Sequence, residues 1–211
     1  MSEIGTVNWS EHLEKYFSDT AERCQCLAIV HRRAEQVYAR KRTLIDIPVI
    51  VISGLVGFMS VGSTSMFEGQ EKLSSILLGI CSLIVSVINT LGTYQGYAKL
   101  AEGHRIGAIQ YARLYRFLSL ELRLERSERM SPTDLLKQTK ETYDRLQEVS
   151  PPFPVELISE FKKEFEKYTT ISKPPELNGL EEVIIRVDNP MREVKSETFP
   201  TPKETLTLEH N

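Results

Sequence analysis

The stretch IPVIVISGLVGFMSVGSTSMF, from Ile47 to Phe67, contains no charged residue and is separated by four residues from the basic string YARKR, which ends at Arg42. A helix rises about 1.5 Å per residue, so about 20 uncharged residues cross the roughly 30 Å hydrocarbon layer of a membrane. A second uncharged stretch runs from Leu73 to Ala98. We therefore predict an all-α membrane protein in which a two-helix transmembrane hairpin continues into long cytosol-side amphipathic helices.

Charge is distributed unevenly along the chain. Lys, Arg, Asp and Glu make up 26% of the 211 residues, yet between positions 47 and 98 the only charged residues are Glu68, Glu71 and Lys72. The alternative interpretation is a pair of apolar helices buried inside a soluble helical bundle. The rest of the sequence is too polar to enclose two such helices on every side, which favours the membrane.

Basic residues flank the two apolar stretches. Arg40, Lys41 and Arg42 precede the first stretch and Lys99 and Arg105 follow the second, whereas the short connector holds a single Lys. The positive-inside rule therefore places both termini in the cytosol. The polar N-terminal sequence does not have the pattern of a cleaved signal peptide.

The segments outside the apolar stretches have the periodicity of amphipathic helices. Tyr16 and His31 belong to an apolar stripe in the N-terminal segment, and a matching stripe that includes Tyr111 predicts its partner. Capping patterns predict helix starts at Asn8 and Ser131. The predicted organisation is an N-terminal amphipathic helix at 1–46, transmembrane helix 1 at 47–67, a connector at 68–72, transmembrane helix 2 at 73–94, a helical cytosol-side stalk at 95–168 and a Pro-rich extended tail at 169–211.

Prolines and composition predict the interruptions. Pro48 stands near the start of the first span, where we expect its missing N–H to cost nothing. The segment from Gln95 to Arg129 is expected to leave the membrane as one continuous helix. The string SPPFP at 150–154 ends the helix before it. In the tail, VIIRV at 183–187 is the only strand-like piece.

Small and polar residues recur every three or four positions along the second span. They are Ser75, Gly79, Ser82, Ser86, Asn89 and Thr93. This period is typical of helix–helix contacts, so packing within the hairpin or between copies is one interpretation. The other is that Ser82, Ser86 and Asn89 line an aqueous pore when several copies assemble. In the first span, Ser53 and Gly57 form a similar small-residue step.

Two further groups of residues are candidates for binding roles. Arg40, Lys41 and Arg42 invite a nucleic-acid interpretation, but their position against a span favours phospholipid headgroups and no nucleic acid. His31 and His104 lie on the helices at either side of the spans, in a position to approach each other. No carboxylate or thiolate stands near them at ligand spacing, so we expect packing or surface histidines, without a metal.

No catalytic or nucleotide-binding motif occurs in the sequence. We expect no enzymatic activity and no cofactor.

The layout resembles the SLATT family of two-transmembrane proteins. The similarity covers about residues 8 to 168: a helix that opens near Trp9, two spans, the Tyr- and Leu-rich AIQYARLYRFLSLELRL, and the PPFP break. The resemblance implies a membrane-perforating effector of bacterial conflict systems, controlled by a nucleotide sensor. No sensor domain is recognisable in these 211 residues, so a separately encoded partner would supply it. Similar two-span proteins occur in large DNA viruses with an internal membrane.

Two functions follow from these patterns. The first is a non-enzymatic structural protein that tethers a bilayer to a neighbouring protein shell, as a minor capsid protein at the inner membrane of a virion would. Residues 171–211 would then bind the shell proteins. The second is a SLATT-like oligomeric pore-forming effector built from several copies. Both require the lipid bilayer as a partner.

Overall fold

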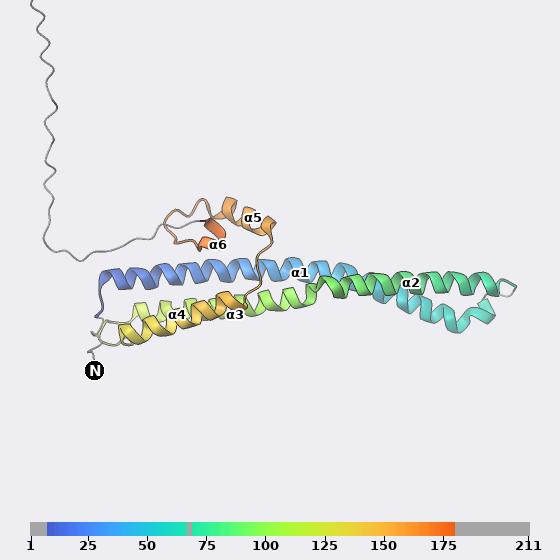
Figure 1. Cartoon of the computed structure of the whole chain (residues 1–211), viewed down its shortest axis with the longest axis horizontal. Helices are drawn as coiled ribbons and strands as arrows, with labels where there is room; N and C mark the ends of the chain where they lie inside the picture. The colour runs from blue at the N-terminus through green and yellow to red at the C-terminus, as the bar shows by residue number, and fades with distance from the viewer. Residues whose placement is uncertain (1–7, 67–68, 180–211) are drawn as a thin grey trace, which may run out of the picture. The chain divides into compact units, whose positions relative to one another are not determined.

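The computed structural model describes residues 8–66 and 69–179, and these residues form helices, turns and loops with no β-strand. The all-α prediction is confirmed for this part of the chain. Residues 180–211, with VIIRV and most of the predicted tail, lie outside the described residues. The helices, drawn in Figure 1, are α1 Glu11–Met66, α2 Glu71–Gln95, α3 Tyr97–Arg123, α4 Pro132–Val149, α5 Val155–Phe165 and α6 Pro175–Asn178.

Helix α1 is continuous across the boundary between the N-terminal amphipathic segment and the first apolar stretch. At its start, Ser10 Oγ accepts a hydrogen bond from the backbone N–H of Leu13 at 3.3 Å. Ser10, and not the predicted Asn8, therefore occupies the capping position. Phe17 is fully buried on its inner face, whereas Tyr16, which we had predicted there, is 44% exposed. Neighbouring residues are about 100° apart around a helix, so an error of one position exchanges the buried and the exposed side.

Pro48 lies in the interior of α1. The expectation that its missing N–H costs nothing is wrong, because the residues before it are already helical. Proline has no backbone N–H, so the carbonyl of Leu44 does not receive the helical hydrogen bond that residue 48 would otherwise donate.

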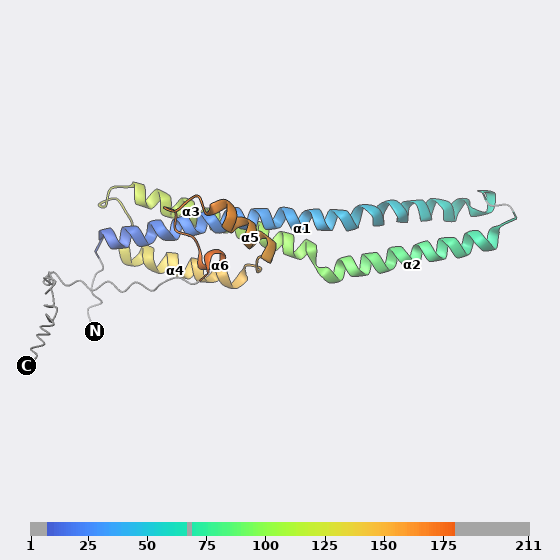
Figure 2. The same ribbon diagram turned by 90° about the horizontal axis from the view of Figure 1, so that it is seen from above.

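A turn at Gly96 separates α2 from α3, where the sequence predicted one continuous helix. Gly96 has φ 62° and ψ 25°, in the left-handed region, and its N–H donates to the carbonyl of Thr93 at 3.1 Å. Glycine adopts this conformation without the steric penalty of a Cβ atom. Helix α3 then runs beside the first half of α1, and Figure 2 shows the change of direction between α2 and α3.

The first half of α1 forms a hydrophobic core with α3, α4 and α5. Helix α1 packs along α3, α4 packs on α3, and α5 packs on α1. Ser131 stands at the N-cap of α4, with Pro132 in the first turn, as predicted. The most deeply buried core residues include Phe17, Cys24, Leu27, Val30, Tyr111, Leu118, Leu135 and Phe161.

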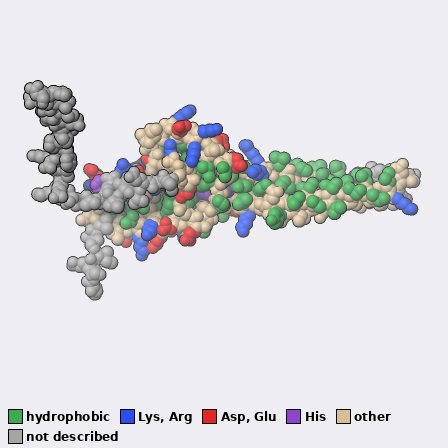
Figure 3. All heavy atoms as spheres, turned by 45° about the horizontal axis from the view of Figure 1, so that its top comes forward, with side chains coloured by type: hydrophobic (Ala, Val, Ile, Leu, Met, Phe, Trp, Pro, Cys, Tyr) green, Lys and Arg blue, Asp and Glu red, His purple; other side chains and the backbone are tan. Residues whose placement is uncertain are grey.

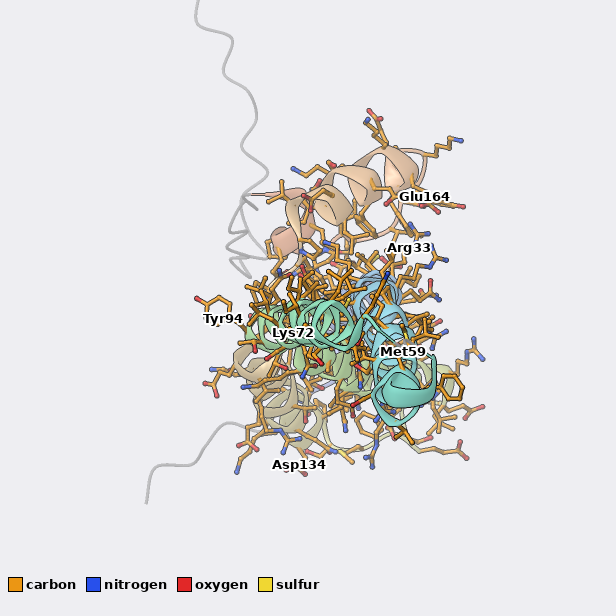
Figure 4. All side chains as sticks on the ribbon, turned by 90° about the vertical axis from the view of Figure 1, so that its right-hand side faces the viewer. Arg33, Met59, Lys72, Tyr94, Asp134 and Glu164 are labelled. Carbon is orange, nitrogen blue, oxygen red and sulfur yellow. The ribbon has the colours of Figure 1, made fainter. Side chains whose placement is uncertain are left out.

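A surface ion pair joins α5 to α1. Arg33 donates to both carboxylate oxygens of Glu164, at 2.5 Å and 2.9 Å. Figure 4 shows the two labelled side chains reaching toward each other.

The first residues of the predicted extended tail are packed against the chain itself. The N–H of Ser172 donates to Glu22 at 2.7 Å, and the hydroxyl of Ser172 accepts a hydrogen bond from Arg23 at 3.2 Å. Leu177 in the short helix α6 is 1% exposed. Pro174 is also fully buried, and Ile171 packs against the core. Residues 171–179 therefore form part of the folded unit, which composition alone did not indicate because few apolar residues anchor them.

Helix α2 packs against the apolar second half of α1. The partly covered positions on each helix recur every three or four residues, whereas the residues between them are exposed. This 3.5-residue period is the one that keeps two helices in contact along a seam. The partly covered residues are Ile45, Val49, Ile52, Val56 and Met59 on α1, and Leu78, Cys81, Val85, Ile88 and Gly92 on α2.

Candidate functional site

The apolar parts of α1 and α2 expose large hydrophobic side chains. Two helices of the described chain are long and apolar enough to cross a membrane, and none of their most apolar stretch is buried. Figure 3 shows hydrophobic side chains gathered over this region, with Lys and Arg side chains at its two ends. The exposed residues are Ile47, Ile50, Val51, Leu55, Phe58 and Val61 on α1, and Leu73, Ile76, Leu77, Ile80, Leu83, Ile84, Val87 and Leu91 on α2.

The soluble-bundle alternative predicts that other parts of the chain cover these helices. Among the described residues, α2 packs only along one side of the apolar half of α1, and the α3–α5 bundle lies beside the other half. The described chain therefore leaves this apolar surface uncovered.

The predicted headgroup-binding residues stand at the boundary of the apolar surface. Arg40, Lys41 and Arg42 are all exposed. Arg42 Nε donates to Asp46 at 3.0 Å, one helical turn further along α1. Lys41 Nζ lies 5.7 Å from the centre of the Tyr38 ring and 6.0 Å from the centre of the Tyr97 ring, within range of a cation–π interaction.

Aromatic side chains mark the same boundary, which the sequence analysis did not single out. Tyr94, in the last turn of α2, is 88% exposed, and Figure 4 shows it pointing away from the helices. Tyr38 and Tyr97 approach each other from α1 and α3, with ring centres 6.1 Å apart. Tyrosines next to a long apolar run are typical of a membrane–water interface, and that pattern was available in the sequence.

The predicted small and polar seam forms one exposed stripe along α2. All six of its residues are exposed: Ser75, Gly79, Ser82, Ser86, Asn89 and Thr93. The α2 residues that contact α1 each precede a residue of this stripe by one position. The hydroxyl of Thr93 donates to the carbonyl of Asn89 at 2.9 Å, which satisfies it within the helix. The seam therefore does not mediate the α1–α2 contact.

The two apolar helices approach each other closely at Gly92. A Cβ atom at this position would lie 2.9 Å from Ile45 Cγ2, so a larger residue would force the side chain of Ile45 to move. The small-residue step predicted in the first span, Ser53 and Gly57, makes no close helix contact. A Cβ at Gly57 would have no neighbour within 4 Å, and Ser53 is exposed.

His31 and His104 form a buried pair between α1 and α3. Their Nδ1 atoms are 2.8 Å apart, and the two side chains are 1% and 0% exposed. One Nδ1 carries a proton and donates a hydrogen bond to the other Nδ1, which must be unprotonated to accept it, so the two rings cannot both be charged. His104 Nε2 is also buried and has no hydrogen-bond partner among the described residues. The predicted approach of the two histidines is thus present, inside the fold and away from its surface.

Aromatic rings enclose the pair. His31 stacks on Tyr111 with ring centres 5.4 Å apart, and His104 stacks on Tyr38, also at 5.4 Å. Phe153, in the Pro-rich loop after α4, contacts both imidazoles. Burial lowers the pKa of His31 to about 3, with a contribution from His104, and burial lowers the pKa of His104 to about 4.

The two imidazoles are therefore neutral at physiological pH. Within the described ranges, no group of three or more His, Cys, Asp or Glu side chains is placed to hold a metal ion. The arrangement supports a structural contact that joins α1, α3 and the loop at Phe153.

Comparisons of the chain with protein-family models, with curated proteins and with solved structures find no match.

Proposed function

We propose that this chain is a non-enzymatic, membrane-anchored structural protein. In this proposal the second half of α1 and α2 form a transmembrane hairpin, and the remaining helices and the C-terminal tail lie on the cytosolic side. There they bind a neighbouring protein shell, such as the capsid of a virion that encloses a membrane. The uncovered apolar surface of α1 and α2 is the observation that carries the proposal.

The size of that surface favours lipid as its surroundings. Each Val, Leu, Ile or Phe side chain that leaves water contributes about 1.5 to 3 kcal/mol. The partly exposed set on α1 and α2 therefore represents on the order of 20 kcal/mol, which exceeds the net stability of about 5 to 15 kcal/mol of a typical domain. Helix α2 has 25 residues, enough to cross a layer of about 30 Å.

The fold also suits a tether. Because α1 is one helix, the proposed span and the cytosol-side bundle share a continuous backbone. Residues 171–179 pack on the chain itself, so we assign shell binding to residues 180–211. Segments rich in Pro and poor in apolar residues order when a partner compensates the loss of conformational entropy.

The membrane assignment is tested by labelling the two sides of the proposed hairpin. In a variant without Cys24, Cys26 and Cys81, one new cysteine replaces either Gln70, before α2, or Ser127, between α3 and α4. A membrane-impermeant maleimide added to right-side-out spheroplasts of a bacterial host is expected to label Gln70→Cys at once. Labelling of Ser127→Cys is expected only after the membrane is permeabilised.

Alkaline carbonate extraction of the same membranes provides the control for insertion. We expect the chain to remain in the pellet. Release into the supernatant, or equal labelling of both cysteines in intact spheroplasts, would contradict the proposal.

A second candidate function, a pore assembled from several copies, is favoured by the position of the polar seam. Ser82, Ser86 and Asn89 are exposed on α2 and are not used in the contact with α1. Polar groups on the surface of a membrane-spanning helix are stabilised by water in a channel or by another helix. The resemblance to the SLATT family supports the same function.

A further inference from the structure

A cavity of about 440 Å³ lies where α1, the end of α2 and the start of α3 meet. The α1–α2 contact at Gly92 closes it on one side, and the turn at Gly96 forms another wall. Its polar and charged lining side chains are Arg42, Asp46, Asn89, Thr93, Tyr97 and Lys99.

The charges of this lining suit an anion. Arg42 and Lys99 contribute two positive charges and Asp46 one negative charge. The hydrogen bond from Arg42 Nε to Asp46 holds the guanidinium at the cavity and uses one of its five N–H donors. Lys99 forms no ion pair among the described residues, and the amide of Asn89 is exposed at the other wall. The cavity therefore offers several donors and a net positive charge.

The location selects the class of anion. This inference rests on the proposed function, in which residue 47 begins the first span. Arg42 then lies about 8 Å of helix before the span, at the depth of lipid phosphates. Asn89 and Thr93 lie in the last turns of α2 and extend the lining toward the hydrocarbon layer. Ile45 and Gly92 provide an apolar wall beside them.

We propose that this cavity binds the headgroup of one anionic glycerophospholipid. Arg42 and Lys99 bind the phosphate oxygens, and the amide of Asn89 donates to the same group or to the glycerol ester. The ligand chemistry is that of a phosphodiester, which soluble glycerol phosphate shares in part. The lipid differs from it in having acyl chains that remain in the hydrocarbon layer.

The test measures lipid retention by the full-length protein in a nonionic detergent. Native mass spectrometry counts the phosphatidylglycerol or phosphatidylcholine molecules, with identical acyl chains, that each protein molecule retains. We expect one phosphatidylglycerol at concentrations where phosphatidylcholine is not retained. Arg42→Gln and Lys99→Gln should each weaken its retention about tenfold, the loss of one charge-assisted hydrogen bond.

The matched control is Arg32→Gln, which removes the same charge from an exposed position ten residues earlier on α1, outside the cavity lining. We expect this variant to retain phosphatidylglycerol within about twofold of the unchanged protein. Equal losses from Arg32→Gln and Arg42→Gln would overturn the cavity site and indicate diffuse attraction of the anionic lipid by the positive charges of the protein. Binding of soluble glycerol phosphate as tight as that of the lipid would overturn the assignment to a lipid.

The two proposals fail in different ways. If the chain is released from membranes by carbonate, the membrane anchor fails and the lipid site with it. If the chain stays in the membrane but shows no preference for phosphatidylglycerol, only the lipid site fails.

Discussion

The buried contact between His31 and His104 makes stability depend on pH over a specific range. Both imidazoles are held neutral by burial, with a pKa of about 3 for His31 and about 4 for His104, against 6.5 in an unfolded chain. Between these values the unfolded chain binds protons that the folded chain does not. The stability is therefore complete above about pH 6.5 and decreases as the pH falls through 6.5 toward 4.

Acidification from pH 7.5 to 5 should destabilise the bundle of α1, α3, α4 and α5. Each histidine contributes up to 1.36 kcal/mol per pH unit below its unfolded pKa, so the pair lowers the free energy of unfolding by about 3 to 4 kcal/mol. Thermal unfolding of the detergent-solubilised protein, followed by the fluorescence of Trp9, measures the change. Trp9 is the single tryptophan of the chain and packs against Phe17 in this bundle.

Two substitutions identify the source of this pH dependence. The double variant His31→Gln, His104→Gln should have a nearly constant melting temperature between pH 7.5 and 5. Glu14, whose pKa is lowered to about 2 by its hydrogen bonds from Arg126 and Arg129, affects stability only below about pH 4.5. A melting temperature of the unchanged protein that does not vary over this range would contradict the prediction.

Among the helices, the boundary between α2 and α3 depends on one backbone conformation. The turn at Gly96 was missed by the sequence analysis because the apolar and small residues continue with helical spacing on both sides of it. Its φ of 62° is tolerated by Gly and disfavoured for residues with a Cβ atom. In contrast, the capping of α4 at Ser131 was predicted, because Ser followed by Pro is a local signal.

Gly96→Ala should destabilise the protein by about 1 kcal/mol, because alanine is strained in the left-handed conformation. Gly54→Ala is the matched control within a helix. A Cβ at Gly54 would have no neighbour within 4 Å, so this change should be neutral or slightly stabilising. Thermal unfolding of both variants in the same detergent gives the comparison, and equal effects would show that the turn does not require glycine.

At the level of the whole molecule, the exposed seam of α2 can contact other copies of the chain. If several copies assemble into a pore, Ser86→Leu together with Asn89→Leu should abolish ion flux through liposomes that contain the protein. Thr90→Leu removes a hydroxyl from the same helix outside the seam, and it should leave the flux unchanged. A protein that gives no flux above empty liposomes would leave the structural tether as the proposed function and exclude the pore.

The two long apolar segments, their basic flanks and the amphipathic segments around them were all predicted from the sequence. These features depend on composition and length within one segment, and no distant contact is needed to produce them. The beginning of the tail shows the limit of this reasoning, because residues 171–179 are ordered by contacts with α1 that composition does not encode.

Which side of each helix is covered depends on contacts between distant parts of the chain, and the sequence pattern did not predict it. On α2, the seam of Ser82, Ser86 and Asn89 and the contact line of Cys81, Val85 and Ile88 have the same spacing. They differ by one residue, or about 100° of rotation, which periodicity cannot resolve. The same holds for His31 and His104, whose Nδ1 atoms meet at 2.8 Å because α3, after the change of direction at Gly96, packs along the first half of α1.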